Sequence, residues 1–141
     1  MVYILLAPGF EEMEALVPAD LLRRAGLEVA LTTVGPALVP GGHNITVQAD
    51  LTLDQVTLKD GDMENLAACP GVETLVRRAA ADELVWLAAI CAAPTLLAHW
   101  GLLNGKKAVC YPGLENRLTG AIPQQGVSLV QDGKVITAQG P

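Results

Sequence analysis

Few residues in this chain could build a disulfide framework or a metal centre. Its 141 residues include only three cysteines, Cys69, Cys91 and Cys110, an odd number at wide spacing with no CxxC pair. Neither of the two histidines stands at metal-ligand spacing from a cysteine. We therefore expect no disulfide framework and no metal site, and a reducing cytoplasm is the expected location.

Basic residues are also scarce. Nine Lys and Arg face fifteen Asp and Glu, which gives a formal net charge of -6 at pH 7. Adjacent basic residues occur only as the pairs Arg23-Arg24, Arg77-Arg78 and Lys106-Lys107. Nucleic-acid binding needs clustered positive charge, so we expect no nucleic-acid partner. The N-terminal apolar run is too short for a membrane span and lacks the basic start of a signal peptide, so we expect no membrane partner either.

The apolar residues predict one α/β domain, spanning 1–141, with an aliphatic core. Hydrophobic residues make up 51% of the chain and aromatic residues only 4%. The run Val2–Leu6 has no polar alternation, as in a strand that is covered on both faces. A helix over 11–25 and a strand over 28–34 complete a βαβ opening, which favours an α/β fold. Further along, the patterns predict a loop at 35–42, strands at 44–48, 85–90 and 107–111, helices at 72–81 and 95–100, and a hairpin of 127–130 with 135–137 around Asp132-Gly133.

One region does not fit this pattern. A parallel sheet needs a buried strand between Leu51 and Val72, but residues 58–66 contain no apolar run of sufficient length. Asp62-Met63 is typical of a strand that is beginning, whereas Glu64 and the two residues after it are typical of a helix already under way. We therefore expect a strand-loop segment to be missing between 62 and 64.

Cys91 lies at the most informative point of the chain. It ends the apolar run of residues 84–90, and small residues and a helix-like segment follow it. A tight turn at a strand-to-helix junction directs the cysteine side chain outward, and the positive end of the next helix favours a thiolate. The pattern predicts a nucleophile or an oxidation sensor, with an ordinary buried cysteine as the alternative.

Two short motifs stand out along the chain. Cys91 lies within Ala-Ile-Cys-Ala-Ala-Pro, and Glu14 closes Gly-Phe-Glu-Glu-Met-Glu. Arg-Arg-Ala-Gly at 23–26 and the closing Gln-Gly-Pro at 139–141 accompany them. Together these motifs resemble those of the DJ-1/ThiJ/PfpI superfamily along nearly the whole chain. The sequence most resembles the DJ-1- and YajL-like branch, historically labelled thiazole monophosphate biosynthesis (ThiJ).

The resemblance implies a flavodoxin-like three-layer α/β sandwich with a mostly parallel sheet, of the class I glutamine amidotransferase-like type, and a homodimer. It assigns Cys91 as the nucleophile and redox-sensitive thiol, and Glu14 as the carboxyl that hydrogen-bonds its sulfur. A poorly solvated carboxyl beside a thiolate is expected to keep its proton and donate it. The backbone N–H of Ala92 would help to hold a developing oxyanion. No cofactor is expected.

The sequence also departs from the family. The Pro-Gly-Gly strand expected between 62 and 64 is missing, and the chain stops at Pro141, where the family continues into a C-terminal helix. Tyr111 occupies a position where some members carry a histidine. Ala92 stands where the PfpI protease branch has histidine, which argues against protease activity. His43 matches a position where relatives carry a basic residue that reaches the partner subunit's site, and the loop of Gly9 is expected to border the pocket.

The resemblance leaves three functional hypotheses. The first is an enzyme of reactive carbonyls, either glyoxalase III-like or deglycase-like, whose partners are small carbonyl substrates or glycated proteins. The second is a non-catalytic oxidative-stress sensor or redox chaperone that works through oxidation of Cys91. The third is a cysteine amidase or hydrolase, which needs a histidine poised on Cys91, and only His43 and His99 are present.

Overall fold

The structure, a computed structural model, describes residues 1–56 and 70–140 and the backbone of residues 62–64. Cys69 lies outside the described residues. The helices are α1 (Glu12–Arg24), α2 (Pro70–Ala81) and α3 (Pro94–His99), with 3-10 turns η1 (Leu53–Gln55) and η2 (Glu115–Arg117). The strands are β1 (Val2–Leu6), β2 (Val29–Thr33), β3 (Leu38–Pro40), β4 (Thr46–Gln48), β5 (Leu51–Thr52), β6 (Asp62–Glu64), β7 (Leu87–Ile90), β8 (Lys107–Ala108), β9 (Ile122–Pro123), β10 (Leu129–Asp132) and β11 (Val135–Ala138).

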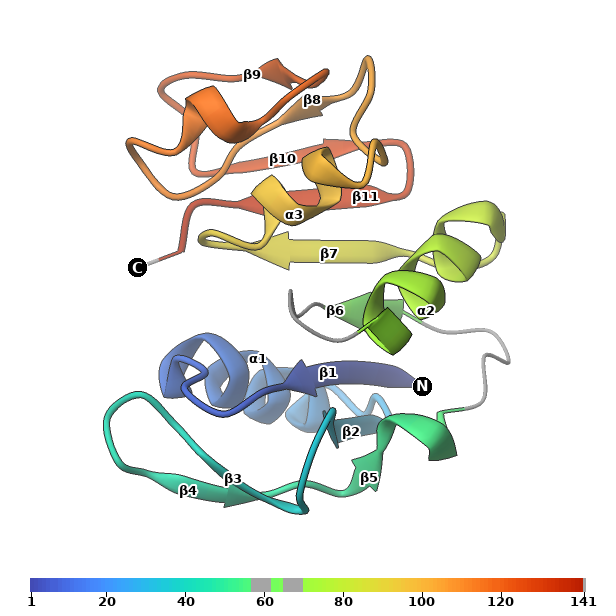
Figure 1. Ribbon diagram of the computed structural model, residues 1–141, viewed down its shortest axis with the longest axis vertical. Helices are drawn as coiled ribbons and strands as arrows, with labels where there is room; N and C mark the ends of the chain where they lie inside the picture. The colour runs from blue at the N-terminus through green and yellow to red at the C-terminus, as the bar shows by residue number, and fades with distance from the viewer. Residues whose placement is uncertain (57–61, 65–69, 141) are drawn as a thin grey trace.

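A seven-stranded sheet forms the centre of the domain, in the order β10-β11-β7-β6-β1-β2-β5. Every pairing in it is parallel except that of β10 with β11. Figure 1 shows α2 and α3 on one face of this sheet and α1 on the other. The predicted fold class, a flavodoxin-like three-layer α/β sandwich with a mostly parallel sheet, is confirmed.

The alternating side chains of β1 join the two cores. Tyr3 and Leu5 pack in the cluster that contains residues of α2 and α3. Ile4 and Leu6 pack in a second cluster with Ala15 of α1 on the other face. Because both faces of a central parallel strand are covered, the strand needs no polar alternation. This explains why β1 reads as an unbroken apolar run.

Helix α1 begins and ends close to the predicted limits. Glu11 is its N-cap, and the Glu11 side chain accepts a hydrogen bond of 2.7 Å from the backbone N–H of Glu14. Gly26 follows the helix with a φ of 84°, the left-handed conformation that favours glycine after a C-cap. The helix continues through Pro18. The N-cap contact fixes the first turn of α1, from which the Glu14 side chain projects.

Several segments differ from the sequence prediction. The strand predicted at 107–111 is limited to β8, which pairs with β9 in a separate two-stranded sheet. Residues 38–40, inside the predicted loop, form β3, which pairs antiparallel with β4 and buries Val39 completely. One buried residue between prolines gives no strand pattern in the sequence. Glu64, predicted to be helical, belongs to the strand β6 between β1 and β7; Asn65 and Leu66 lie outside the described residues.

The predicted C-terminal hairpin is confirmed, with Gly133 and Lys134 as its two-residue loop. Strand β11 also pairs in parallel with β7, so the ends of the two strands lie at the same edge of the sheet. The backbone N–H of Cys91 donates to the carbonyl of Ala138 at 3.0 Å. The hairpin therefore brings Gly140 beside the cysteine. No helix of the described residues has the length and apolar character needed to cross a bilayer.

Candidate active site

Cys91 occupies a strained turn directly after β7. Its φ is 61°, and Asn44 is the only other non-glycine residue with a positive φ among the described residues. Such a conformation is unfavourable for an L side chain and persists only where the surroundings hold it. The Cys91 N–H donates to Ala138, and the Cys91 carbonyl accepts a 2.7 Å hydrogen bond from the N–H of Tyr111. The strand-to-helix turn predicted from the sequence is therefore present.

Glu14 reaches the thiol from α1, on the other side of β6. Its carboxyl group lies close enough to the Cys91 side chain to raise the pKa of the thiol. Gly140 lies against both residues, with a φ of 86°. A Cβ at Gly140 would lie 2.9 Å from Glu14 Oε1 and 3.0 Å from Cys91 Cβ. Glycine at this position therefore leaves the space in which the two groups meet. No pattern in the sequence predicts this role, and only the Gln-Gly-Pro motif indicated the residue.

The pKa of the Cys91 thiol is raised to about 11. Burial is the largest cause, and the hydrogen bond and negative charge of Glu14 add to it, with a smaller contribution from Glu11. A hydrogen bond from the backbone N–H of Ala92 acts in the opposite direction. The sequence predicted a thiolate, so the direction of this prediction is wrong. The following helix α3 has only six residues, and its dipole does not outweigh desolvation.

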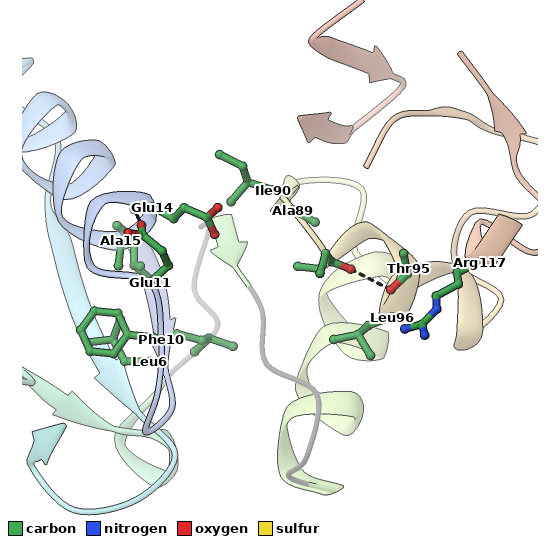
Figure 2. A pocket seen from close by; sticks show the side chains of 14 residues that line it. Leu6, Phe10, Glu11, Glu14, Ala15, Ala89, Ile90, Thr95, Leu96 and Arg117 are labelled. Atoms are coloured by element: carbon green, nitrogen blue, oxygen red, sulfur yellow. Dashed lines mark hydrogen bonds between the residues drawn. The ribbon is translucent and has the colours of Figure 1, made fainter. Parts of the chain in front are cut away.

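A pocket of about 370 Å³ lies beside this pair. Figure 2 shows Glu11 and Glu14 at its α1 wall, and Thr95 and Arg117 on the opposite side. The neighbours of Cys91, Ile90 and Ala92, line the pocket, whereas Cys91 itself does not. The thiol therefore stands next to the pocket. The lining is mostly apolar: Ile4, Leu5, Leu6, Phe10, Ala15, Ala89, Ile90, Ala92, Ala93 and Leu96.

The three predicted supporting residues do not line this pocket. Gly9 has a φ of 83° and serves a turn, and its N–H donates to the carbonyl of Pro40. Tyr111 holds the carbonyl of Cys91 through its backbone, and its side chain is 44% exposed. The His43 ring instead lies beside the Glu12 carboxylate. The supporting role expected for Gly9, Tyr111 and His43, which for His43 concerns the partner subunit's site, stays a prediction.

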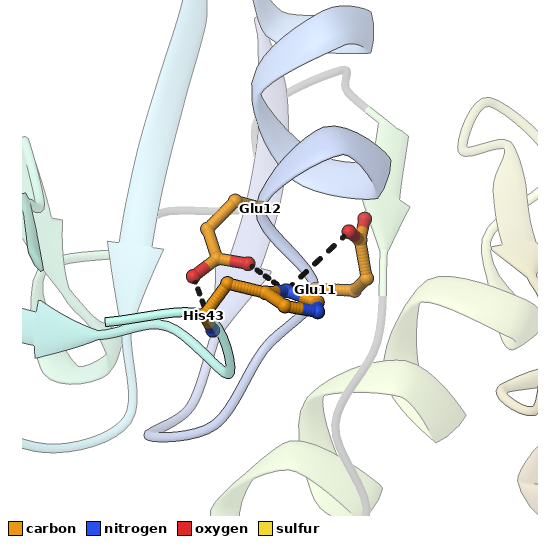
Figure 3. A group of neighbouring side chains, drawn as sticks. All are labelled: Glu11, Glu12 and His43. Atoms are coloured by element: carbon orange, nitrogen blue, oxygen red, sulfur yellow. Dashed lines mark hydrogen bonds and ion pairs between the residues drawn. The ribbon is translucent and has the colours of Figure 1, made fainter. Parts of the chain in front are cut away.

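Glu11, Glu12 and His43 form a second group of polar side chains, shown in Figure 3. The buried Glu12 carboxylate accepts hydrogen bonds from the His43 backbone N–H at 2.7 Å and lies 2.8 Å from its Nδ1. Burial by itself raises the pKa of Glu12, but these hydrogen bonds outweigh it and lower the pKa to about 2. Glu12 in turn raises the pKa of His43.

This group ties the β3–β4 turn to the start of α1. A Cβ at Gly41 would overlap the Glu12 carboxylate, so glycine there admits the ion pair. The three side chains offer ligand atoms within 4.8 Å of one another, which is close enough to hold a metal ion. However, hydrogen bonds within the protein already engage the Glu12 carboxylate and Glu11 Oε2. No local pattern in the sequence predicts this buried pair, because His43 lies 31 residues from Glu12.

Neither histidine acts on the thiol. The charged side chains that shift the pKa of Cys91 are Glu14 and Glu11, with no histidine among them. His43 pairs with Glu12, and His99 is exposed at the last residue of α3. The site therefore pairs a thiol with a carboxyl, and not with an imidazole.

Known proteins are similar to this chain along nearly its whole length. A family model described as the DJ-1/PfpI family matches residues 1–141. The chain is 36% identical over 152 residues to Protein DJ-1 homolog B of Arabidopsis thaliana, and the match covers 99% of this chain and 34% of that protein. It is 33% identical over 149 residues to Protein dj-1beta of Drosophila melanogaster, with coverage of 98% and 80%. A deglycase of Pyrococcus horikoshii is 28% identical over 149 residues, with coverage of 99% and 90%.

The chain thus spans about a third of the length of the Arabidopsis relative. These matched spans exceed the 141 residues of the chain, so the relatives carry residues within them that have no counterpart here. The position of the missing segment, between 62 and 64, stays a prediction.

Solved structures share the fold. A DJ-1 superfamily protein from Salmonella typhimurium has a TM-score of 0.90 at 33% identity, covering 99% of this chain and 80% of that one. Drosophila melanogaster DJ-1beta has a TM-score of 0.86 at 31% identity, with coverage of 99% and 81%. Because a family model matches its whole length and solved members share its fold, the chain belongs to the DJ-1/PfpI family.

Proposed function

We propose that this chain is a cysteine-dependent stress-response enzyme that acts on small reactive carbonyls, with no cofactor. The observation that carries the proposal is the position of the Glu14 carboxyl beside Cys91, where both lie against Gly140, next to a pocket of about 370 Å³. A thiol is a strong nucleophile toward aldehydes once its proton is removed, and a carboxylate in contact with it can take that proton. The deglycase among the relatives gives the proposal further support.

The first step forms a hemithioacetal. The raised pKa of Cys91 keeps the proton on sulfur before the substrate binds. As the sulfur attacks the aldehyde carbon of methylglyoxal, Glu14 accepts the thiol proton and passes it to the carbonyl oxygen. A carbon–sulfur bond forms and the carbonyl π bond breaks. The N–H of Ala92, which points at the sulfur, can stabilise charge that develops next to it.

The second step rearranges this adduct without an external oxidant or reductant. Glu14 takes the proton from the former aldehyde carbon and delivers it to the neighbouring carbonyl carbon, while the hydroxyl proton on the first carbon moves to the former ketone oxygen by way of the enediol; the product is a thioester of lactate. Water then hydrolyses the thioester, releasing lactate and restoring the thiol. An early glycation adduct on a protein amine enters the same route when the thiol replaces the amine at the former aldehyde carbon, so that a carbon–sulfur bond forms, the carbon–nitrogen bond breaks and the amine is released. The mostly apolar pocket limits competition from bulk water.

A direct test is lactate formation from methylglyoxal by the wild-type protein and by Cys91→Ser and Glu14→Ala variants. We expect both variants to lose turnover by at least about a hundredfold, since each lacks one member of the pair. Cys110→Ala serves as the matched control, because Cys110 is a free cysteine buried in the core, away from the pocket lining. Full turnover by Cys91→Ser would refute the proposal.

The second candidate function is an oxidative-stress sensor or redox chaperone. It is favoured by the partial exposure of Cys91 and by the Glu14 and Ala92 groups, which could hydrogen-bond a sulfinate oxygen. Mass spectrometry after mild peroxide treatment tests this candidate. Oxidation confined to Cys91, without methylglyoxal turnover, would favour the sensor, whereas oxidation of Cys69 that spares Cys91 would refute it.

We also propose that the protein acts as a homodimer in the cytoplasm. Three exposed apolar residues follow one another at intervals of four on α1: Met13, Val17 and Leu21, with exposures of 60%, 47% and 60%. This spacing places them on one face of the helix. An apolar stripe of this kind on a surface helix suits a second copy of the chain.

A further inference from the structure

Arg117 brings a positive charge to a pocket whose other charged residues are acidic. Among the lining residues that the structure describes, it is the only cation, and Glu11 and Glu14 are the only anions. Figure 2 shows the two acids on the α1 side and Arg117 on the opposite side, beyond Thr95 and Leu96. The pocket therefore has a negative end near the reacting thiol and a positive end across an apolar interior.

The backbone links Arg117 firmly to Cys91. The N–H of Tyr111 donates to the carbonyl of Cys91 at 2.7 Å, and the N–H of Leu114 donates to the carbonyl of Tyr111 at 3.1 Å. The N–H of Arg117 then donates to the carbonyl of Leu114 at 2.9 Å. Leu118, the next residue, is 3% exposed and anchors the segment in the core. Three consecutive hydrogen bonds thus set the position of the arginine backbone relative to the cysteine.

The guanidinium of Arg117 is available for a ligand. Across residues 1–56 and 70–140, no carboxylate lies within ion-pair distance of it, whereas Arg23, Arg24 and Arg77 each pair with one. The adjacent Glu115 carboxylate instead accepts a hydrogen bond from the N–H of Gly113. Arg117 is exposed, and its planar guanidinium can bind a carboxylate that enters the pocket through two parallel hydrogen bonds.

We propose that Arg117 is a specificity-determining residue, and that the site selects aldehydes that carry a carboxylate or similar anion at the end remote from the reacting carbon. The proposal rests on the carbonyl chemistry proposed above and specifies its substrate class. A 2-oxoaldehyde such as 4,5-dioxopentanoate has this form: its aldehyde reaches the thiol while its carboxylate meets the guanidinium. Without Arg117, the two glutamates and the net charge of -6 would repel such an anion.

The kinetic test compares 4,5-dioxopentanoate with its uncharged methyl ester, so that shape is nearly constant and only the charge changes. In the wild-type protein we expect the acid to have the higher kcat/KM. In Arg117→Gln the acid-to-ester ratio of kcat/KM should fall about tenfold or more, mainly through KM, because a hydrogen-bonded charge pair is lost. Arg117→Lys should retain part of the ratio, and Arg78→Gln, an exposed arginine on α2, should retain all of it. An unchanged ratio in Arg117→Gln would overturn the proposal. A general disturbance of the pocket lowers kcat/KM for both substrates together and leaves the ratio as it was.

A binding test separates this inference from the catalytic proposal. In a Cys91→Ala protein, NMR titration with 4-oxopentanoate and its methyl ester measures recognition of the anion without any reaction. We expect the acid to bind more tightly than the ester, and Arg117→Gln to remove that difference. Equal binding of acid and ester before the substitution would refute the role of Arg117, even if methylglyoxal is turned over. Preference for the acid without turnover of any aldehyde would support the role and refute the enzyme proposal.

Discussion

Replacement of Glu14 by glutamine should make Cys91 more reactive and the enzyme less active. The thiol has a pKa of about 11, so only about one molecule in a thousand carries a thiolate at pH 8. Burial, the largest cause of the raised pKa, survives the substitution, whereas the charge of Glu14 and its hydrogen bond to the thiol are lost. We therefore expect the pKa of the thiol to fall, which increases the thiolate fraction about tenfold for each pH unit of the fall. A thiolate of lower pKa is a weaker nucleophile, so the observed rate should rise about threefold for each such unit.

The assay is alkylation of Cys91 by iodoacetamide between pH 7 and 9, followed by peptide mass spectrometry to separate it from the other two cysteines. Glu14→Gln should be alkylated faster than the wild-type protein, yet its turnover of methylglyoxal should fall by at least about a hundredfold, because no base remains to move the proton. Glu73→Gln is the matched control, since Glu73 lies on α2 and pairs with Arg77 away from the site.

Slower alkylation of Glu14→Gln, with an unchanged circular dichroism spectrum, would refute the reasoning. It would mean that the carboxyl carries the proton and donates it to a thiolate, as expected from the sequence motif. The two descriptions differ in the direction of the hydrogen bond, which runs either from the thiol to the carboxylate or from the carboxyl to the thiolate. The direction of the change in alkylation rate therefore decides between them.

Three further predictions concern the surroundings of the pair. Gly140→Ala should displace the Glu14 carboxyl, because the added Cβ would lie 2.9 Å from it. We expect about a tenfold loss of turnover, measured by kinetics, and a loss of about 1–2 kcal/mol in the free energy of unfolding, measured by urea denaturation. Unaltered turnover would contradict the packing argument. The stability that His43→Gln removes should be largest between about pH 4.5 and 6.5. This loss of stability should shrink as the pH rises through the raised pKa of His43, and also as the pH falls toward about 2, the pKa of Glu12. Thermal unfolding at a series of pH values tests this, and a pH-independent loss would count against the ion pair. Leu21→Asp should convert the dimer to monomer in sedimentation experiments without unfolding it, since this side chain is 60% exposed; a persistent dimer would exclude the α1 stripe as the interface.

Three neighbouring acids show what the sequence could and could not predict. Glu11, Glu12 and Glu14 lie together at the start of one helix. From this position alone, all three are expected to make the same favourable interaction with the helix dipole. In the structure Glu11 caps the helix, Glu12 is buried against His43, and Glu14 meets the thiol. The motif identified Glu14 through resemblance alone. The partners of the other two come from segments far along the chain, which local patterns do not reveal.

The position of the cysteine could be predicted because an apolar run, small residues and a proline define a strand, a turn and a helix locally. The direction of the thiol's pKa could not be predicted in the same way. It depends on how deeply the turn is buried and on how closely α1 approaches β7 from the other side of β6, and both are properties of the packed domain. Strand β3 was missed for a related reason, since its single buried residue, Val39, is stabilised by docking and not by a pattern of its own.

The carboxyl ends of β1 and β7 account for an apolar pocket beside a polar pair. In the sheet order β6 lies between these two strands, and its described residues pair with Val2 to Ile4 of β1 and, at Met63, with β7. Leu5 and Leu6 of β1 and Ala89 and Ile90 of β7 follow these paired residues, and they line the pocket. Apolar strand ends therefore form walls for a ligand, and Glu14 and Arg117 supply the charge that the sheet itself lacks.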